Sequence, residues 1–246
     1  MIKPAIWINP GVVAIYGSSI DAASHSHHSI QVIWCKEDLD CKLNNKAIAG
    51  TTLVNSMVEH QLEMSEGWVL LIEPNSNLGA ELSAKLAGEL YKSFPISNFT
   101  INELSKETEE INDYLEPLFS ELGLTQQFLV LNENKVKDKR IQQLLTELNQ
   151  CLKGDCIKPS SWRASEVAKQ LALSESRFLH LFSEEMGISW RPYLLWRRMM
   201  CAIQALVNNK SATEAAYLAG FSDSAHLSRT FRKNFGMSIR QALSLF

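Results

Sequence analysis

The amino-acid sequence predicts an α+β protein, in which a small β-barrel or sandwich with flanking helices precedes an all-α domain that contains two helix-turn-helix units. Three observations predict this class. Short runs of β-branched and aromatic residues dominate the first ~75 positions. Apolar residues at helical spacing dominate the remainder, and the last third of the chain contains an internal repeat. A polar segment at 131–139 separates the two parts, so we place the domains at 1–134 and 135–246.

The composition is that of a globular protein with a buried core. Of the 246 residues, 46% are hydrophobic and 21% are charged, which is ordinary for such proteins. The opening MIKPAIWINP lacks the cationic and apolar regions of a signal peptide, and no stretch approaches the ~18–20 apolar residues of a membrane helix. The five cysteines include no C-x-x-C pair. We therefore expect free thiols, with Cys35 and Cys41 as apolar fillers, a cytoplasmic location and no membrane partner.

Short strands are expected to build the first domain. Turn-forming residues such as Asn9-Pro10-Gly11 separate runs that are rich in β-branched and aromatic side chains. Many short strands with turns between them predict a small barrel or sandwich. The predicted strands cover 5–8, 12–16, 30–34, 51–54 and 68–73.

Two helices are expected to flank these strands. From Leu78 an apolar residue recurs at every fourth position, which is typical of a helix with one apolar stripe. Thr100 and Glu103 have the spacing of a capping box, and they open a second helical pattern that continues to Leu122. Pro117 is expected to kink or split this second helix, because proline lacks the backbone donor and clashes one turn back.

The second domain contains two copies of one pattern. Residues 165–189, SEVAKQLALSESRFLHLFSEEMGIS, match residues 213–238, TEAAYLAGFSDSAHLSRTFRKNFGMS. Each copy predicts a short helix, a tight turn and a second helix. In the second copy, Gly220 supplies the left-handed residue that a sharp turn requires, and Ser222 and Asp223 follow as helix-capping residues.

The last helix of the second copy is predicted to have one buried and one free face. Leu227, Phe231 and Phe235 recur every four residues and therefore point to the core. The free face holds Ser224, Ala225, Ser228, Arg229 and Arg232. Small polar residues and arginines on a free face suit the DNA major groove, where arginine contacts guanine edges or phosphates. The alternative is a plain helical bundle with solvated arginines, and the presence of two copies favours DNA binding.

Charge is distributed unequally along the chain. Residues 1–136 carry 8 Lys and Arg against 18 Asp and Glu, whereas residues 137–246 carry 16 against 9. Such asymmetry favours a nucleic-acid-binding part joined to a part that avoids nucleic acid. A chance imbalance of solvated faces is the alternative.

Residues 137–246 resemble the DNA-binding domain of the AraC/XylS family of transcriptional regulators. The resemblance rests on AGFSDSAHLSRTFRKNFGMS in the second copy and on RRMMCAIQAL between the copies. It implies two helix-turn-helix units on one long helix, each inserting a recognition helix into successive major grooves. Carried over by position, the resemblance implies DNA contacts from Ser176, Arg177, Leu179, His180, Ser224, Ala225, His226, Ser228, Arg229 and Arg232.

Several positions depart from the family pattern. Ala172 stands where the family usually has the turn glycine, and a positive φ there would cost ~1 kcal/mol. Leu179 is apolar where the family often has a polar reader, so it either contacts a thymine methyl group or packs on the core. Ile239 and Ala242 replace the proline and the aromatic residue that are common after the last Gly-x-Ser.

A histidine-rich stretch, SHSHHSIQV, lies in the first domain. The resemblance implies a cupin-like sensor barrel there, because such a barrel commonly precedes the DNA-binding domain in this family. His25, His27 and Gln31 resemble the first cupin metal motif, with glutamine in place of glutamate, and VEHQL places His60 where a second motif would supply a ligand.

We interpret this set as the wall of an effector pocket. The effector-binding candidates are His25, His27, Gln31 and His60. No resident metal and no cofactor are expected, because a glutamine carries no negative charge to offset a divalent ion. The alternative is a first-row divalent metal held by three histidines and one oxygen donor.

Together these features predict a cytoplasmic transcription regulator without catalytic residues. Its expected partners are double-stranded DNA, a small-molecule effector and, for an activator, RNA polymerase. The acidic helix at 102–122 or the helix at 78–94 can form a homodimer interface. The alternative is that the apolar faces of these helices pack on the barrel of the same chain. The alternatives are a metal-dependent cupin enzyme with a helical assembly domain and a constitutive DNA-binding protein with a vestigial barrel.

Overall fold

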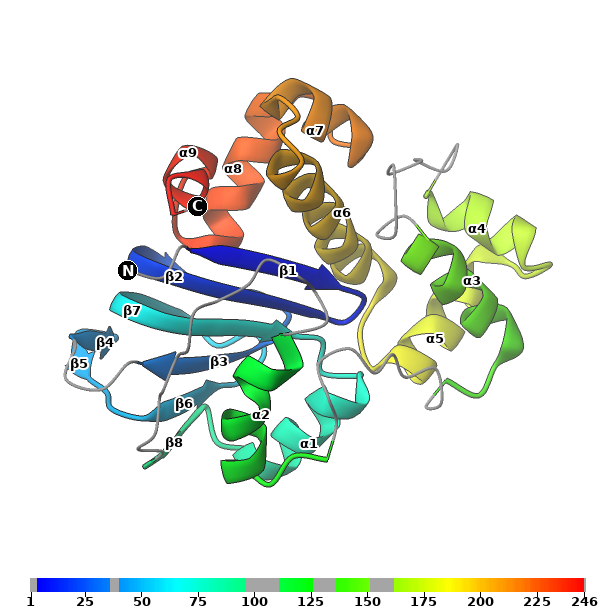
Figure 1. The fold of residues 1–246 in the computed structure, drawn as a ribbon. Coiled ribbons are helices and arrows are strands. Elements are labelled where there is room, and N and C mark those ends of the chain that lie inside the picture. The colour runs from blue at the N-terminus through cyan, green and yellow to red at the C-terminus, as the bar shows by residue number, and fades with distance from the viewer. Residues whose placement is uncertain (1–3, 36–39, 96–110, 126–135, 151–161, 246) are drawn as a thin grey trace. The chain divides into compact units, whose positions relative to one another are not determined.

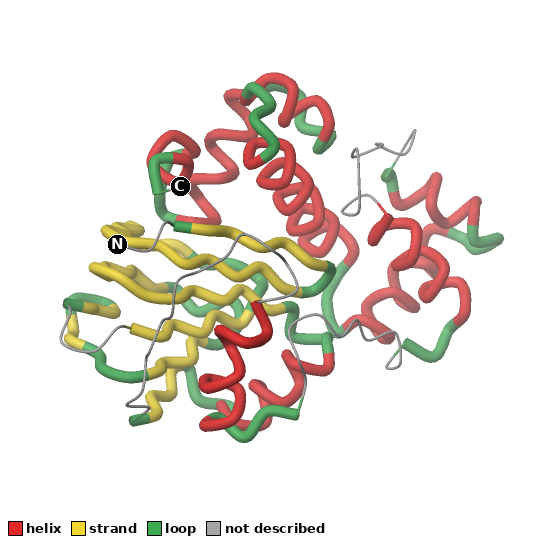
Figure 2. The backbone as a smooth tube through the Cα atoms, viewed as in Figure 1, coloured by secondary structure: helices red, strands yellow, loops and turns green. Residues whose placement is uncertain are grey.

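The structure is a computed structural model that describes residues 4–35, 40–95, 111–125, 136–150 and 162–245. The chain divides into two compact units, which are described here separately (Figures 1 and 2). The first unit comprises residues 1–131 together with 230–246, and the second comprises residues 132–229. The boundary expected between 134 and 135 falls outside the described residues and stays a prediction.

An antiparallel sheet forms the centre of the first unit, as the α+β class requires. The strands pair in the order β1-β2-β7-β3-β6-β8, and β4 pairs with both β5 and β7. The strands are β1 (Ala5–Asn9), β2 (Val12–His25), β3 (Ile30–Cys35), β4 (Cys41–Leu43), β5 (Lys46–Ala47), β6 (Thr51–Val54), β7 (His60–Ile72) and β8 (Tyr91–Phe94). All five predicted strands are present, but β2 and β7 are much longer than predicted, and β4, β5 and β8 were not predicted.

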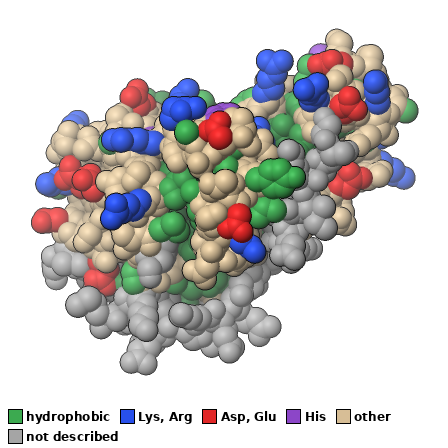
Figure 3. All heavy atoms as spheres, turned by 90° about the horizontal axis from the view of Figure 1, so that it is seen from above, with side chains coloured by type: hydrophobic (Ala, Val, Ile, Leu, Met, Phe, Trp, Pro, Cys, Tyr) green, Lys and Arg blue, Asp and Glu red, His purple; other side chains and the backbone are tan. Residues whose placement is uncertain are grey.

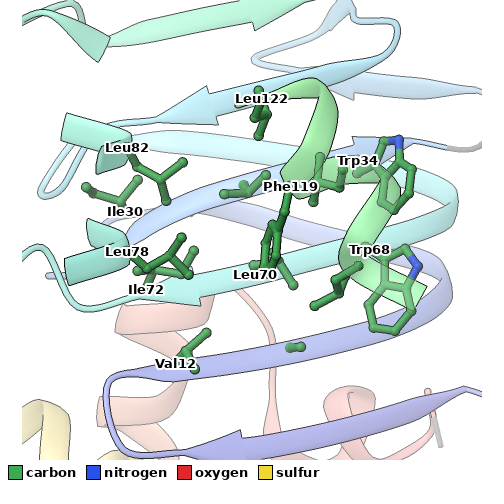
Figure 4. Packing of buried hydrophobic residues seen from close by; sticks show 14 of the residues in the cluster. Val12, Ile30, Trp34, Trp68, Leu70, Ile72, Leu78, Leu82, Phe119 and Leu122 are labelled. Atoms are coloured by element: carbon green, nitrogen blue, oxygen red, sulfur yellow. The ribbon is translucent and has the colours of Figure 1, made fainter. Parts of the chain in front are cut away.

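Two helices supply the apolar side chains that cover the sheet core. In α1 (Asn77–Leu86) the apolar stripe is buried, and in α2 (Ile111–Glu121) the buried residues again lie on one face. Figure 4 shows Leu78 and Phe119 pointing toward Leu70 and Ile72 of β7. Packing of the apolar face against the sheet stabilises these helices more than helix propensity alone does. The four-residue spacing of leucines therefore indicates where the helices form.

Both flanking helices differ in detail from the prediction. The leucine pattern predicts a helix that continues to Leu90, but α1 ends at Leu86 because Ala87 adopts a left-handed conformation with φ of 49°. Helix α2 runs through Pro117 without splitting. The predicted capping pair Thr100 and Glu103 lies outside the described residues.

The second unit is helical throughout its described part. A buried cluster from α3, α4, α5 and the start of α6 packs around three aromatic rings, Phe178, Phe182 and Trp190, whose ring centroids lie 5.0–5.9 Å apart. The chain then continues through α8, which begins in the second unit and ends in the first. The helices of this unit are α3 (Lys139–Gln150), α4 (Ala164–Gln170), α5 (Glu175–Met186), α6 (Trp190–Val207), α7 (Ala212–Leu218) and the first part of α8 (Ser224–Phe235). Helix α9 (Ile239–Leu243) lies in the first unit.

The cysteines correct one expectation. Cys35 and Cys41 form a disulfide with a Cα–Cα distance of 6.4 Å, and Cys201 is also disulfide-bonded. The prediction of free thiols is therefore wrong for these three. None of the helices in the described ranges has the length and apolar character needed to cross a membrane.

Candidate functional site

Four buried polar side chains of the first unit meet where β2, β3 and β7 come together. His25 ends β2 and pairs directly with His60, the first residue of β7, while Gln31 lies in β3. His27 lies in the connection between β2 and β3. Their exposed fractions are 7% for His25, 3% for His27, 2% for Gln31 and 1% for His60. The structure thus brings all four effector-binding candidates together.

The three imidazole rings of this histidine cluster (His25, His27 and His60) are close neighbours. The ring centroids of His25 and His60 are 4.3 Å apart, and His27 lies 5.3 Å from His60 and 5.6 Å from His25. Burial lowers the pKa of His25 to about 4 and that of His27 to about 3, with a further contribution from the neighbouring His60. Burial also lowers the pKa of His60. The rings are therefore neutral near pH 7.

Hydrogen bonds hold each ring of the cluster in place. The Nδ1 atoms of His25 and His60 lie 2.8 Å from the Ala23 carbonyl oxygen and 3.0 Å from the Val58 carbonyl oxygen, respectively. The Nδ1 atom of His27 lies 3.1 Å from the Ser29 carbonyl oxygen and 2.8 Å from the Ser29 hydroxyl oxygen. These contacts orient the rings toward one another, and the role of Ser29 was not predicted from the sequence.

The first helix-turn-helix of the second unit contains α4 and α5. Ala172 in the turn has a φ of 53°, so this alanine adopts the left-handed conformation. Its N–H donates to the Lys169 carbonyl at 3.1 Å, and the Leu173 N–H donates to the Ala168 carbonyl at 2.8 Å. Ser174 then caps α5 by accepting a hydrogen bond from the Arg177 N–H at 3.2 Å.

The predicted contact residues of α5 are not equally available. Ser176, Arg177 and His180 are exposed. Leu179 is half-buried and packs against the core of the second unit. Of the two readings of Leu179, this position favours packing over contact with a thymine methyl group.

A sharp turn connects α7 to α8, as the sequence predicts. Gly220 has a φ of 77°, and the Phe221 N–H donates to the Ala216 carbonyl at 2.8 Å. Asp223 accepts a hydrogen bond from the His226 N–H at 2.6 Å and so caps α8. This bond, followed by a second one from the Ser222 hydroxyl, lowers the pKa of Asp223.

Arg198 of α6 contacts the same turn through its side chain. Its Nε donates to the Ala219 carbonyl at 2.9 Å, a terminal nitrogen donates to the Gly220 carbonyl, and the guanidinium lies 4.4 Å from the centre of the Phe221 ring. Burial lowers the pKa of Arg198. Sequence reasoning did not assign this role, because the arginine precedes its partners by more than 20 residues.

Helix α8 has the two predicted faces. Leu227, Phe231 and Phe235 are buried, which confirms the predicted apolar stripe. The other predicted residues of this helix are exposed or half-buried: Ala225, Ser228, Arg229 and Arg232 are exposed, whereas Ser224 and His226 are half-buried. The His226 ring stands edge-on to Phe221 with a centroid distance of 5.2 Å, so it helps to join the turn to the helix.

Comparisons with known proteins agree with this geometry. The family described as a helix-turn-helix domain matches residues 167–244. Residues 167–244 form an AraC-type helix-turn-helix domain. The chain is 34% identical over 82 residues to the virulence regulon transcriptional activator VirF of Yersinia enterocolitica, which is 33% of this chain and 30% of VirF.

A longer alignment extends beyond the AraC-type domain. The chain is 30% identical over 139 residues to the transcriptional activator RhaS of Escherichia coli, covering 55% of this chain and 49% of RhaS. The chain therefore spans about a third to a half of the length of these relatives. The apo crystal structure of a ToxT variant from Vibrio cholerae shares the fold at 12% identity and a TM-score of 0.54, covering 96% of this chain and 98% of ToxT.

One face of the protein carries charges of both signs (Figure 3). On the face that Figure 3 draws, lysine and arginine side chains are interspersed with aspartate and glutamate. The arginines of the AraC-type domain that the sequence proposed as DNA contacts, Arg177, Arg229 and Arg232, are all exposed.

Proposed function

We propose that this protein is a sequence-specific DNA-binding transcription regulator. The observation that carries the proposal is the exposed face of α8, which presents Ala225, Ser228, Arg229 and Arg232 while its opposite face is buried. Small side chains let a helix approach the floor of the major groove, and arginine can make paired hydrogen bonds to guanine. The matched relatives carry the names of transcriptional activators, which agrees with this role.

The two helix-turn-helix units have different contributions in this proposal. In α8, Arg229 reads a base edge and Arg232 contacts the phosphate backbone. In α5, the exposed Ser176, Arg177 and His180 supply further contacts, while Leu179 supports the helix from the core side. Contacts to phosphates position the domain, and contacts to base edges provide the sequence preference.

The first unit acts as the sensor in this proposal, and the chain is a regulator rather than an enzyme. A small-molecule effector binds at the histidine cluster and shifts the equilibrium between conformations that bind DNA with different affinities. RNA polymerase is a partner if the protein activates transcription. The proposal also includes that the protein forms a homodimer and is located in the cytoplasm.

Selection of bound sequences from a random duplex DNA pool by the full chain tests the proposal. We expect an enriched motif with two half-sites and binding that weakens steeply with salt, because each neutralised phosphate releases counterions. The matched control is the double variant Arg229→Ala with Arg232→Ala, which should fold normally and lose the enrichment. Recovery of no motif, or of the same motif by the control, would contradict the assignment of α8.

A further inference from the structure

We infer that His25, His27 and His60 form a binding site for one divalent transition-metal ion of the zinc class. The ligand atoms of the three rings all lie within 4.8 Å of one another. This reverses the expectation from the sequence, in which the glutamine argued against a metal. The metal site itself stands independently of the proposed function, and only its regulatory effect depends on that function.

The backbone determines which nitrogen of two rings carries the proton. Ala23 and Val58 present carbonyl oxygens to the Nδ1 atoms of His25 and His60. A carbonyl oxygen only accepts hydrogen bonds, so both Nδ1 atoms must be protonated. In a neutral imidazole the other nitrogen then has a free lone pair. His25 and His60 are therefore in the tautomer whose Nε2 can bind a metal.

Gln31 places His27 in the same tautomer. The terminal amide atom of Gln31 at the Oε1 position lies 3.2 Å from Nε2 of His60 and 2.9 Å from Nε2 of His27. Nε2 of His60 is unprotonated and can only accept a hydrogen bond, so the Gln31 amide must present its NH₂ group to this atom. The oxygen and the nitrogen of a side-chain amide have nearly the same shape, and the hydrogen bonds decide which atom occupies which position. The two amide hydrogens donate to both rings. His27 then donates from Nδ1 to the Ser29 carbonyl.

The resulting arrangement has the features of a metal-binding site. One ring nitrogen from each of the three histidines lies within 4.8 Å of the others. Each ring donates its Nδ1–H to a backbone carbonyl, which is the partner that commonly orients metal-bound histidines. Zinc binds histidine nitrogens at ~2.0–2.1 Å in tetrahedral geometry, which places ligands ~3.3 Å apart. The rings therefore need to draw together by at most about 1.5 Å, and imidazole ligands are suited to zinc, copper, iron and nickel.

Gln31 has two roles in this site. In the metal-free protein its NH₂ group satisfies the lone pairs of His27 and His60. When a metal binds, rotation of the amide by half a turn brings the carbonyl oxygen toward the ion as a fourth ligand. The charge objection is weaker than the sequence implies, because catalytic zinc sites with three neutral histidines and a water ligand are stable.

A regulatory effect follows from the neighbours of the histidine cluster within the first unit. The Ala23 N–H donates to the Gly236 carbonyl at 3.1 Å, and the His27 ring lies 6.5 Å from the Phe235 ring. Ala23 is also the residue whose carbonyl orients His25. Phe235 is the last residue of α8. Contraction of the three rings around an ion therefore acts on the C-terminal end of α8.

Cobalt(II) titration of the chelator-treated full chain tests the site. Tetrahedral cobalt absorbs visible light strongly, so we expect an intense spectrum that saturates at one ion per chain and is abolished by stoichiometric zinc. His27→Gln and His60→Asn should each weaken binding by at least ~100-fold, since loss of an outer-shell partner alone costs 10–100-fold. His28→Ala and His180→Ala are matched controls with unchanged binding.

Two further measurements keep the outcome independent of variant folding. Gln31→Glu adds a negative charge at the fourth ligand position and should tighten zinc binding while circular dichroism shows an unchanged fold. Zinc should raise the melting temperature of the unaltered chain and leave that of His27→Gln unchanged. A featureless or weak cobalt spectrum in the unaltered chain, or equal affinity in all variants, would overturn the metal site.

DNA binding by the zinc-loaded and zinc-free chain then tests regulation separately. A several-fold difference in DNA affinity that disappears in His27→Gln is expected. If zinc binds but DNA affinity does not change, the coupling is wrong and the metal site stands. If no DNA binds under either condition, the proposed function fails, while the cobalt spectrum still decides the site.

Discussion

Arg197 and Arg198 are adjacent in α6, yet Arg197 binds the end of α3 and Arg198 binds the turn of the second helix-turn-helix. A terminal nitrogen of Arg197 donates to the Leu148 carbonyl at 3.0 Å and to the Asn149 side chain at 2.8 Å, both at the end of α3. Arg198 instead donates to carbonyls of the turn before α8. One turn of α6 thus contacts both α3 and the turn that precedes α8.

Replacement of Arg198 should loosen the second helix-turn-helix. We expect Arg198→Met to lower the free energy of unfolding by ~1.5–3 kcal/mol, because a charged donor is lost and its carbonyl partners are left unsatisfied. Arg198→Lys should not restore the loss, since an ammonium group lacks the planar pair of donors that reaches both carbonyls. Denaturant unfolding measures the effect, and Arg191→Met at an exposed position of the same helix is the control.

DNA affinity gives a second readout for the same variants. The turn that Arg198 holds sets the position of α8, so Arg198→Met should also weaken binding to the selected motif. Arg191→Met should leave both quantities unchanged. Full stability in Arg198→Met would show that the turn holds its shape without the arginine.

Arg229 and Arg232 should differ in how they affect sequence preference. Both are exposed on α8, and Arg229 lies one turn after Ala225. We expect Arg229→Ala to cost ~1–3 kcal/mol on the selected motif and to relax the preference at one base pair, as loss of a paired guanine contact does. Arg232→Ala should weaken binding to all sequences alike. Competition binding on single-base variants of the motif separates the two.

Equal losses from both variants on every sequence would contradict the assignment of Arg229 as the base reader. Lys233→Ala provides the control for charge alone, because Lys233 is exposed on the same helix. Its loss should reduce the salt dependence of binding without altering the motif.

The sequence predicted the helix-turn-helix units well because their signals are local. The buried stripe of Leu227, Phe231 and Phe235 and the left-handed Gly220 depend on residues a few positions apart, and the structure confirms them. The contacts of Arg198 depend on which element packs beside it, and nothing in the local pattern specifies that partner. Long-range hydrogen bonds were missed for this reason.

The sequence grouped the residues of the histidine cluster, but it did not predict the tautomers of the rings. A motif spacing was enough to group His25, His27 and His60 with Gln31. The tautomers depend on carbonyls of Ala23 and Val58, whose positions follow from the pairing of β2 with β7. Because β2 extends well past its predicted end, this pairing could not be predicted from residue composition alone.

Ala172 should be a site where glycine stabilises the protein. Its φ of 53° is unfavourable for a residue with a Cβ atom, and its side chain is exposed. We expect Ala172→Gly to raise the free energy of unfolding by roughly 0.5–1 kcal/mol. The strain energy that glycine removes from the folded state is larger than the conformational entropy that glycine adds to the unfolded chain. Lys169→Gly, three residues earlier in α4, should instead lower it. The same sign for both variants would mean that backbone strain does not decide stability here.

Gly187 and Gly236 occupy matching places in the two repeats and provide a matched test of the contact between residues 230–246 and the sheet. Their φ angles are 65° and 68°. A Cβ atom on Gly187 would have no neighbour within 4 Å, whereas one on Gly236 would lie 2.1 Å from the Ala23 carbonyl oxygen and 2.8 Å from Nδ1 of His25. Alanine therefore introduces the same backbone strain at both positions and a steric clash at only one.

We expect Gly187→Ala to lower the free energy of unfolding by about 1 kcal/mol, which is the cost of a left-handed alanine. Gly236→Ala should lower it by a further ~1–3 kcal/mol, as overpacking does when backbone atoms have to move. Hydrogen exchange at the Ala23 amide gives a direct readout, because that N–H donates to the Gly236 carbonyl. Its protection should fall in Gly236→Ala and stay unchanged in Gly187→Ala. Equal protection in the two variants would show that residues 230–246 do not pack on the sheet in solution, and it would remove the route by which a metal at the histidine cluster reaches α8.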